Sequence, residues 1–122
     1  MSAASKAAAF VRSYRAAHPG AVCNLRRDDG AIEIFDHGRV IHIECRAGDC
    51  ANIDRDITRA QKAAIERLGI AGIPAIVAYF DGPLEWIFIR KDNPGCGPSA
   101  RWRTESGGKK GTLQQYVEDV LE

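Results

Sequence analysis

The sequence predicts an α/β domain with a mixed β-sheet and the element order α-β-β-β-α-β-β-α. Two observations carry this prediction. Two alternating segments, residues 31–35 and 39–46, flank an Asp-His-Gly turn at residues 36–38, which is typical of a β-hairpin. A helical segment then precedes a nearly unbroken apolar run at residues 73–80, as expected of a strand buried on both faces. Together they form a crossover unit, in which residues 39–46 and 73–80 run parallel.

Residues 2–17 predict the first helix, because they are rich in alanine, carry apolar residues at helical spacing and end before Pro19-Gly20. Residues 21–27 alternate between apolar and polar residues, as a half-buried strand does. A turn at residues 28–30 follows, since aspartate and glycine favour turns. These elements lead the chain into the hairpin.

The helix after the hairpin is expected to begin at the capping-box pair Thr58 and Gln61 and to end at Gly69. After the apolar strand, residues 84–90 alternate again and form the last predicted strand. In residues 91–111 the apolar residues have no regular spacing, and glycine, proline and basic residues are frequent. This composition predicts a long basic loop.

A second capping box, Thr112 with Gln115, opens a predicted C-terminal helix at residues 112–121. The apolar residues expected to dock this helix on the core are Leu113, Tyr116, Val117 and Val120.

The composition suits a single domain over residues 1–122, because the chain is 122 residues long and 45% hydrophobic. It has no apolar run of about eighteen residues and no hydrophobic leader at its N-terminus. We therefore expect a soluble, cytoplasmic protein that does not contact membranes.

The chain has four cysteines, Cys23, Cys45, Cys50 and Cys96. In the absence of a leader, reduced thiols are expected rather than disulfides. A zinc site that joins cysteines to His18, His37 or His42 is a third functional hypothesis, although Cys45 and Cys50 lack the two-residue spacing of common zinc knuckles.

The hairpin register sorts its side chains into two faces. One face is apolar and is expected to form core, and it holds Ile32, Ile34, Ile41 and Ile43. On the polar face Glu33 is expected opposite His42, and Glu44 opposite Ala31. Two carboxylates and an imidazole on one face are costly to bring together unless a cation or basic side chains balance them.

This polar face predicts a divalent metal site with Glu33 and Glu44 as ligands. Mg²⁺ and Mn²⁺ take oxygen ligands and promote phosphodiester hydrolysis by activating a water and stabilising the charged transition state. The alternative is that the polar face is the solvated side of an edge hairpin, with Glu33 and His42 as an ordinary cross-strand pair.

Charge is segregated along the chain, although the formal net charge is only +1. Residues 1–27 hold basic residues and no acid, residues 28–56 are rich in acids, and residues 90–110 are basic again. An acidic centre between basic flanks suits a cation site rimmed by phosphate contacts, with an ordinary solvated surface as the alternative. The residues expected to bind nucleic acid are Arg12, Arg15, Arg26, Arg101, Trp102 and Arg103.

Trp102 lies between two of these arginines, Arg101 and Arg103, a combination that can stack on a base and bind phosphate together. The alternative is that the tryptophan packs back on the core, as most tryptophans do.

The order helix, strand, hairpin, helix, buried strand resembles the PD-(D/E)XK nuclease superfamily, above all its small VRR-NUC and Holliday-resolvase-like members, often encoded by phages. The likeness covers roughly residues 5–90 and is carried by the stretch Gly38-Arg39-Val40-Ile41-His42-Ile43-Glu44-Cys45-Arg46-Ala47-Gly48, by Gln61 in the following helix and by Gly72-Ile73-Pro74 before the apolar strand. It implies a restriction-endonuclease-like mixed sheet.

The resemblance assigns Glu44 to the metal-binding glutamate of the E-x-K element and Gln61 to the helix glutamine near the scissile phosphate. Arg46 replaces the lysine of the family, and an arginine cannot give up a proton near neutral pH. The metal-binding aspartate of the family falls on Ala31, and no acid in the first helix matches the glutamate often found there. Glu33 or Asp29 would have to take over the role of that aspartate.

The leading hypothesis is therefore a nuclease-like nucleic-acid-binding protein of phage or mobile-element origin, with Glu44, Arg46 and Gln61 as catalytic candidates. If it is active, it would be a Mg²⁺- or Mn²⁺-dependent DNA endonuclease that holds its metal through Glu44 with Glu33 or Asp29. The alternative is a catalytically inactive binding module with the same fold, such as a DNA-end binder or an inhibitor of a host defence complex. DNA is the expected partner, with a homodimer or a protein partner left open.

Overall fold

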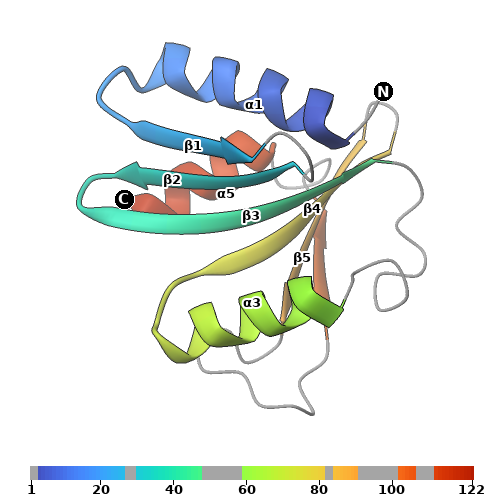
Figure 1. The fold of residues 1–122 in the computed structure, drawn as a ribbon. Helices are drawn as coiled ribbons and strands as arrows, with labels where there is room; N and C mark the ends of the chain where they lie inside the picture. The colour runs from blue at the N-terminus through green and yellow to red at the C-terminus, as the bar shows by residue number, and fades with distance from the viewer. Residues whose placement is uncertain (1–2, 27–29, 48–58, 82–83, 91–101, 107–111) are drawn as a thin grey trace.

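The structure is a computed structural model that describes residues 3–26, 30–47, 59–81, 84–90, 102–106 and 112–122 (Figure 1). Residues 47, 59–62, 81, 84–90 and 102–106 are described by their backbone. The helices are α1 (Ala3–Ala17), α3 (Arg59–Ile70) and α5 (Leu113–Leu121). The strands are β1 (Val22–Arg26), β2 (Ala31–Asp36), β3 (Arg39–Ala47), β4 (Ala75–Asp81), β5 (Leu84–Arg90) and β6 (Trp102–Ser106).

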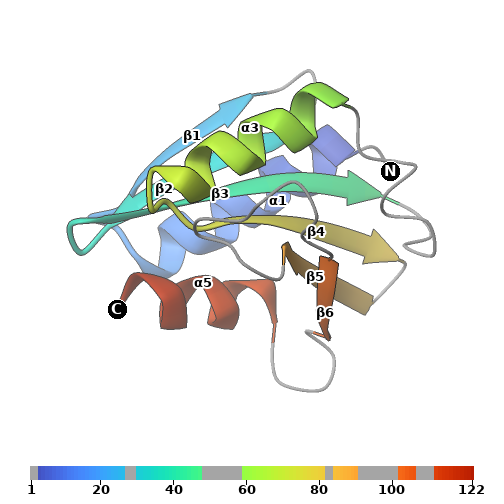
Figure 2. The same ribbon diagram turned by 90° about the horizontal axis from the view of Figure 1, so that it is seen from below.

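The strands form one six-stranded mixed sheet in chain order, β1-β2-β3-β4-β5-β6. β3 and β4 run parallel, and every other neighbouring pair is antiparallel. Helices α1 and α5 cover one face of the sheet, while α3 lies on the other (Figures 1 and 2). The prediction of an α/β domain with a mixed sheet is confirmed.

The hairpin of β2 and β3 has the predicted register. Glu33 pairs with His42 and Ala31 with Glu44. The four isoleucines of the opposite face are fully buried, and they pack with α1 and α5 in the main hydrophobic core. The hairpin is not at an edge, because β1 pairs with β2 and β4 pairs with β3. The alternative for the polar face is therefore wrong about the edge position, although the cross-strand pair of Glu33 and His42 that it named is present.

The predicted crossover is present. Helix α3 connects β3 to β4, whose backbones pair in parallel from His42 opposite Ala75 to Ala47 opposite Phe80. β4 begins after Pro74, a residue that cannot donate to the sheet but whose carbonyl oxygen accepts from the His42 N–H at 2.9 Å. This bond joins the start of β4 to the middle of β3.

Both terminal helices dock as expected. On α1, Ala7, Phe10, Val11 and Tyr14 are buried. Thr112 caps α5, since its Oγ1 accepts from the Gln115 N–H at 3.2 Å. The buried residues of α5 are Leu113, Val117 and Leu121, with Tyr116 and Val120 partly buried against the same core.

One predicted element is wrong. Residues 102–106, expected within the long basic loop, form strand β6, which pairs antiparallel with β5 from Trp102 opposite Arg90 to Ser106 opposite Trp86. The element order is therefore α-β-β-β-α-β-β-β-α. The strand has the sequence WRTES, which is too short and too polar to show an apolar period, and its pairing with β5 defines it instead.

Among the described residues, no helix is both long enough and apolar enough to cross a membrane.

Candidate functional site

The most unusual polar side chains of the sheet are His42 and Glu44, on the central strand β3. They are 6% and 4% exposed, and the His42 Nε2 lies 2.8 Å from Glu44 Oε1. The two side chains share a face because they are two residues apart on one strand. A buried carboxylate needs such a partner, since burial without a hydrogen bond would cost several kcal/mol.

Strand register places further residues on this face, which we call the Glu44 face. Directly paired residues on neighbouring strands have side chains on the same side of the sheet. One row across β1, β2, β3 and β4 is therefore Arg26, Ala31, Glu44 and Val77, and the next is Asn24, Glu33, His42 and Ala75. The residue opposite Glu44 on β2 is thus Ala31, whose side chain is a methyl group.

The centre of the Glu44 face is largely closed to solvent. Val77 and Tyr79 of β4 are buried here, and so is Ile65 of α3. None of the described side chains of α3, residues 63–70, belongs to the core formed with α1 and α5, as expected of a helix on the opposite face. The packing of α3 on this side of the sheet explains why His42 and Glu44 are buried, although they lie on the face opposite the isoleucine core.

A small recess opens beside the buried pair. It has a volume of about 240 Å³. The residues that line it are Asn24, Leu25, Arg26, Ala31, Glu33 and His42. Arg26 is exposed and Glu33 is half-buried, so the recess carries a guanidinium, a carboxylate and an imidazole. It therefore offers both a cationic and an anionic group next to the cross-strand partner of Glu44.

The other predicted catalytic residues are placed as follows. Arg46 lies two residues beyond Glu44 on the same face, where it is half-buried opposite Tyr79. Gln61 lies in the first turns of α3, the helix on that face, and its side chain is outside the described residues. Asp29, a candidate metal ligand, is also outside them.

The predicted nucleic-acid-binding arginines separate onto two sides. Arg26 lies on the Glu44 face, whereas Arg12 and Arg15 are exposed on α1, which packs on the isoleucine face. Arg15 donates from its NH2 group to the Cys23 carbonyl at 2.8 Å and so links α1 to β1.

The predicted aromatic and basic cluster falls partly outside the described residues. Trp102 and Arg103 belong to β6, where the backbone alone is described, and Arg101 lies outside. Base stacking by Trp102 therefore stays a prediction.

The acidic residues of the hairpin differ in whether other metal-ligating side chains lie close to them. In the described part of the chain, one group of three metal-ligating side chains converges, with its ligand atoms within 4.8 Å of one another: His18, Asp36 and His37. Glu33 and Glu44 form no such group with the described residues. Sequence patterns indicated Asp36 only as a turn residue, and the signal that could have pointed to it is the adjacent pair Asp36-His37.

The described cysteines, Cys23 and Cys45, are free and buried, as expected of reduced thiols. Burial, and secondarily the neighbouring Glu44 carboxylate, raise the pKa of Cys45 to about 12. Neither cysteine belongs to the converging metal-ligating group. Cys50 and Cys96 lie outside the described residues.

Comparison with protein-family models, with curated proteins and with solved structures finds no match to the chain.

Proposed function

We propose that the chain is a nucleic-acid-binding protein with a restriction-endonuclease-like fold, which contacts nucleic acid from the Glu44 face. The observation that supports it best is the position of Glu44, in the middle of a central strand that runs parallel to β4 and under a crossover helix. This is the position that the resemblance to PD-(D/E)XK nucleases assigns to a metal-binding glutamate. The element order through β4, α-β-β-β-α-β, agrees with the same architecture.

The surroundings of Glu44 favour binding over hydrolysis. Its cross-strand partner is Ala31, so a second carboxylate is missing from that position. Oε1 of Glu44 is already within hydrogen-bond distance of His42. Arg46, which takes the place of the family's lysine, stays protonated and cannot act as a general base. In this proposal the Glu44 face retains a role in recognition and has lost its catalytic metal.

The arginines supply the phosphate contacts in this proposal. Arg26 lies in the same row of the Glu44 face as Glu44, and Arg46 lies in the next row. Each carries a positive charge that could neutralise a phosphate. Arg12 and Arg15, on α1 at the opposite side of the sheet, are not part of the binding surface in this proposal. By register, Trp102 of β6, opposite Arg90, would extend the binding surface along the Glu44 face. Arg103 is in the row of Ile89, Ile76 and Ile43, on the other side of the sheet, and lies outside this surface.

A second candidate function, a Mg²⁺- or Mn²⁺-dependent DNA endonuclease, is favoured by the recess beside His42. Glu33 lines that recess and shares the Glu44 face, so the pair could supply two carboxylates to a hard cation. Asp29 would be a further oxygen ligand in this candidate.

The test incubates the purified protein with supercoiled, linear and branched DNA in Mg²⁺ or Mn²⁺, beside a Glu44→Ala variant. We expect both proteins to bind DNA and neither to cut it. Cutting by the wild type that the variant has lost would establish the endonuclease instead. Equal cutting by both would indicate a contaminant, and the absence of binding at low salt would refute the proposal.

A further inference from the structure

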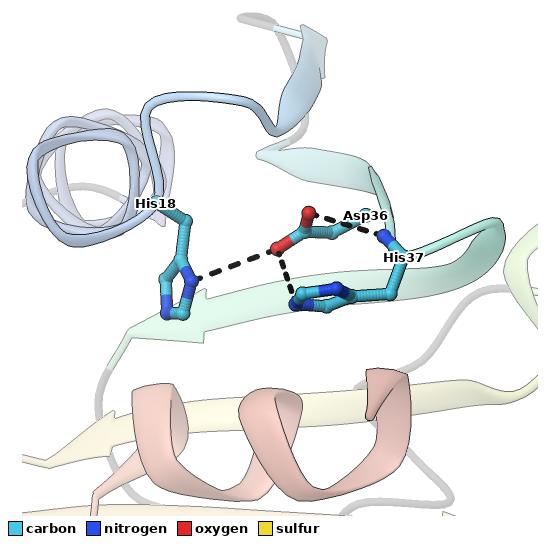
Figure 3. Close-up of side chains that lie close together, drawn as sticks. All are labelled: His18, Asp36 and His37. Carbon is cyan, nitrogen blue, oxygen red and sulfur yellow. Dashed lines mark hydrogen bonds and ion pairs between the residues drawn. The ribbon is translucent and has the colours of Figure 1, made fainter.

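We propose that His18, Asp36 and His37 form a binding site for one divalent transition-metal ion of the zinc type, away from the Glu44 face. The three residues come from two segments of the chain: His18 follows α1, while Asp36 ends β2 and His37 lies in the β2–β3 turn. Their side chains point toward one another beside helix α5 (Figure 3).

The distances between the donor atoms suit a metal ion. The Oδ2 of Asp36 lies 3.6 Å from the His18 Nδ1 and 3.6 Å from the His37 Nε2. Two ligands that are each about 2.0–2.1 Å from a tetrahedral ion lie roughly 3.4 Å apart. All three donor atoms lie within 4.8 Å of one another, so small side-chain rotations would complete the site.

The groups around His18 orient it as a metal ligand. Its Nε2 lies 2.5 Å from Glu118 Oε2 on α5, which leaves Nδ1 to face Asp36. Metal-binding histidines usually donate their second ring N–H to a carboxylate, which fixes the tautomer and makes the ligating nitrogen more basic. The His18 ring also stacks on Tyr14, with ring centroids 4.4 Å apart.

Asp36 is held in place from two sides. The Tyr14 hydroxyl donates to its Oδ2 at 3.2 Å, and the His37 backbone N–H donates to its Oδ1 at 3.1 Å. The carboxylate therefore has a defined orientation before any ion binds.

His37 has a left-handed backbone conformation in the turn between β2 and β3. His37 is the one non-glycine residue with positive φ in the described chain, at 52°. Glycine or asparagine adopts this conformation at lower cost. Both central residues of the turn, His37 and Gly38, have positive φ, as this kind of two-residue hairpin turn requires.

The donor set selects the class of metal. Imidazole nitrogens suit Zn²⁺, Co²⁺, Ni²⁺ and Cu²⁺, whereas Mg²⁺ prefers oxygen ligands alone. Three protein ligands leave one tetrahedral position for water or a small ligand. Asp36 and His37 also line a cleft of about 740 Å³, together with Ile73 and Pro74, from which such a ligand could reach the ion.

The test uses the full chain, stripped with chelator and kept reduced with a phosphine. Zn²⁺ is titrated by calorimetry, and Co²⁺ is added in parallel to read its visible absorption, which reports nitrogen and oxygen ligands in tetrahedral geometry. We expect one ion per chain, a rise in melting temperature with Zn²⁺, and neither effect with the same concentration of Mg²⁺.

Two ligand variants and one control locate the ion. His37→Asn removes a ligand whose side chain is 59% exposed and keeps a residue that tolerates positive φ, so the fold should survive. Asp36→Asn keeps the shape of the carboxylate. We expect each to weaken Zn²⁺ affinity by at least about 100-fold, and Glu118→Ala by roughly 10- to 100-fold. Asp119→Asn, an exposed carboxylate of α5 outside the cluster, should bind Zn²⁺ like the wild type.

The proposal is overturned if the wild type binds no Zn²⁺ or Co²⁺, or if folded His37→Asn and Asp36→Asn bind both ions as tightly as Asp119→Asn does. Either result is independent of nucleic-acid binding, which the Glu44→Ala comparison addresses.

Discussion

The buried pair of His42 and Glu44 is the residue-scale feature with the largest energetic consequence. The two side chains lie in a site shielded by β4 and α3, and the 2.8 Å contact between Nε2 and Oε1 satisfies one hydrogen-bonding atom of each. Removing one partner of such a pair costs more than replacing both with apolar residues.

We predict that His42→Ala lowers the free energy of unfolding by about 3 kcal/mol, because Glu44 loses its imidazole partner inside the fold. The double variant His42→Leu with Glu44→Leu should lose less than this single variant. Urea unfolding curves give both values. A loss below about 1 kcal/mol for His42→Ala would show that the contact with His42 contributes little to holding Glu44 in the fold.

Cys45 provides a pH test of the core. Its pKa rises to about 12 in the folded protein, whereas the thiol of the unfolded chain keeps the ordinary value of 9.0. The folded state therefore holds its proton more tightly, so the stabilisation is complete below pH 9.0 and is lost as pH rises toward 12.

We predict that the free energy of unfolding falls between these two pH values with an extra slope that approaches about 1.4 kcal/mol per pH unit. Cys45→Ala should lack this extra slope, while every other titrating group is common to both proteins. Denaturant curves at several alkaline pH values measure the difference. Parallel pH profiles for wild type and variant would contradict burial of the thiol.

At the scale of elements, the turn between β1 and β2 depends on Gly30. Gly30 has φ of 76°, and a Cβ built on it would lie 3.1 Å from the Ala3 carbonyl oxygen at the start of α1. The same glycine donates its N–H to the Arg26 carbonyl at 2.9 Å. This position thus joins the end of β1 to the first turn of the helix.

We predict that Gly30→Ala destabilises the protein by at least about 1–2 kcal/mol, from the positive φ and the short contact. Gly20→Ala is the matched control, because a Cβ there meets nothing within 4 Å and its φ is not positive, so its effect should stay within about 0.5 kcal/mol. Thermal unfolding of both variants compares them. Equal melting temperatures for the two variants would mean that the start of α1 can move away from residue 30 at little cost.

The elements with a strong local signal were predictable. The Asp-His-Gly turn and the alternation around it gave the hairpin and its register, and the apolar run gave the parallel strand beside β3. β6 was not predictable, because a five-residue polar strand is defined by its pairing with β5 rather than by its own pattern.

The two candidate sites also differ in how well the sequence could predict them. Glu44 and its row across the sheet follow from strand alternation, a local property. The convergence of His18 with Asp36 depends on how α1 returns along β1, and on α5 bringing Glu118 to the same place. These contacts join residues far apart in the chain, so no local pattern could reveal them.

At the scale of the whole molecule, the sheet separates two faces of different composition. The isoleucine side forms the core with α1 and α5, and the Glu44 face carries Arg26 and Arg46 around a buried carboxylate. The candidate transition-metal site lies at the hairpin turn, away from that carboxylate. Nucleic-acid binding and metal binding can therefore be tested by separate substitutions.

The measurement closest to the central proposal is the affinity for DNA as a function of salt, for the wild type, Arg26→Gln and Arg12→Gln. Both arginines are exposed, but Arg26 lies on the Glu44 face and Arg12 on α1. We predict that affinity falls steeply with salt, and that Arg26→Gln weakens binding and reduces the slope of log affinity against log salt by about 1. Arg12→Gln should leave both unchanged. A flat salt response, or a loss of affinity confined to Arg12→Gln, would contradict recognition of nucleic acid by the Glu44 face.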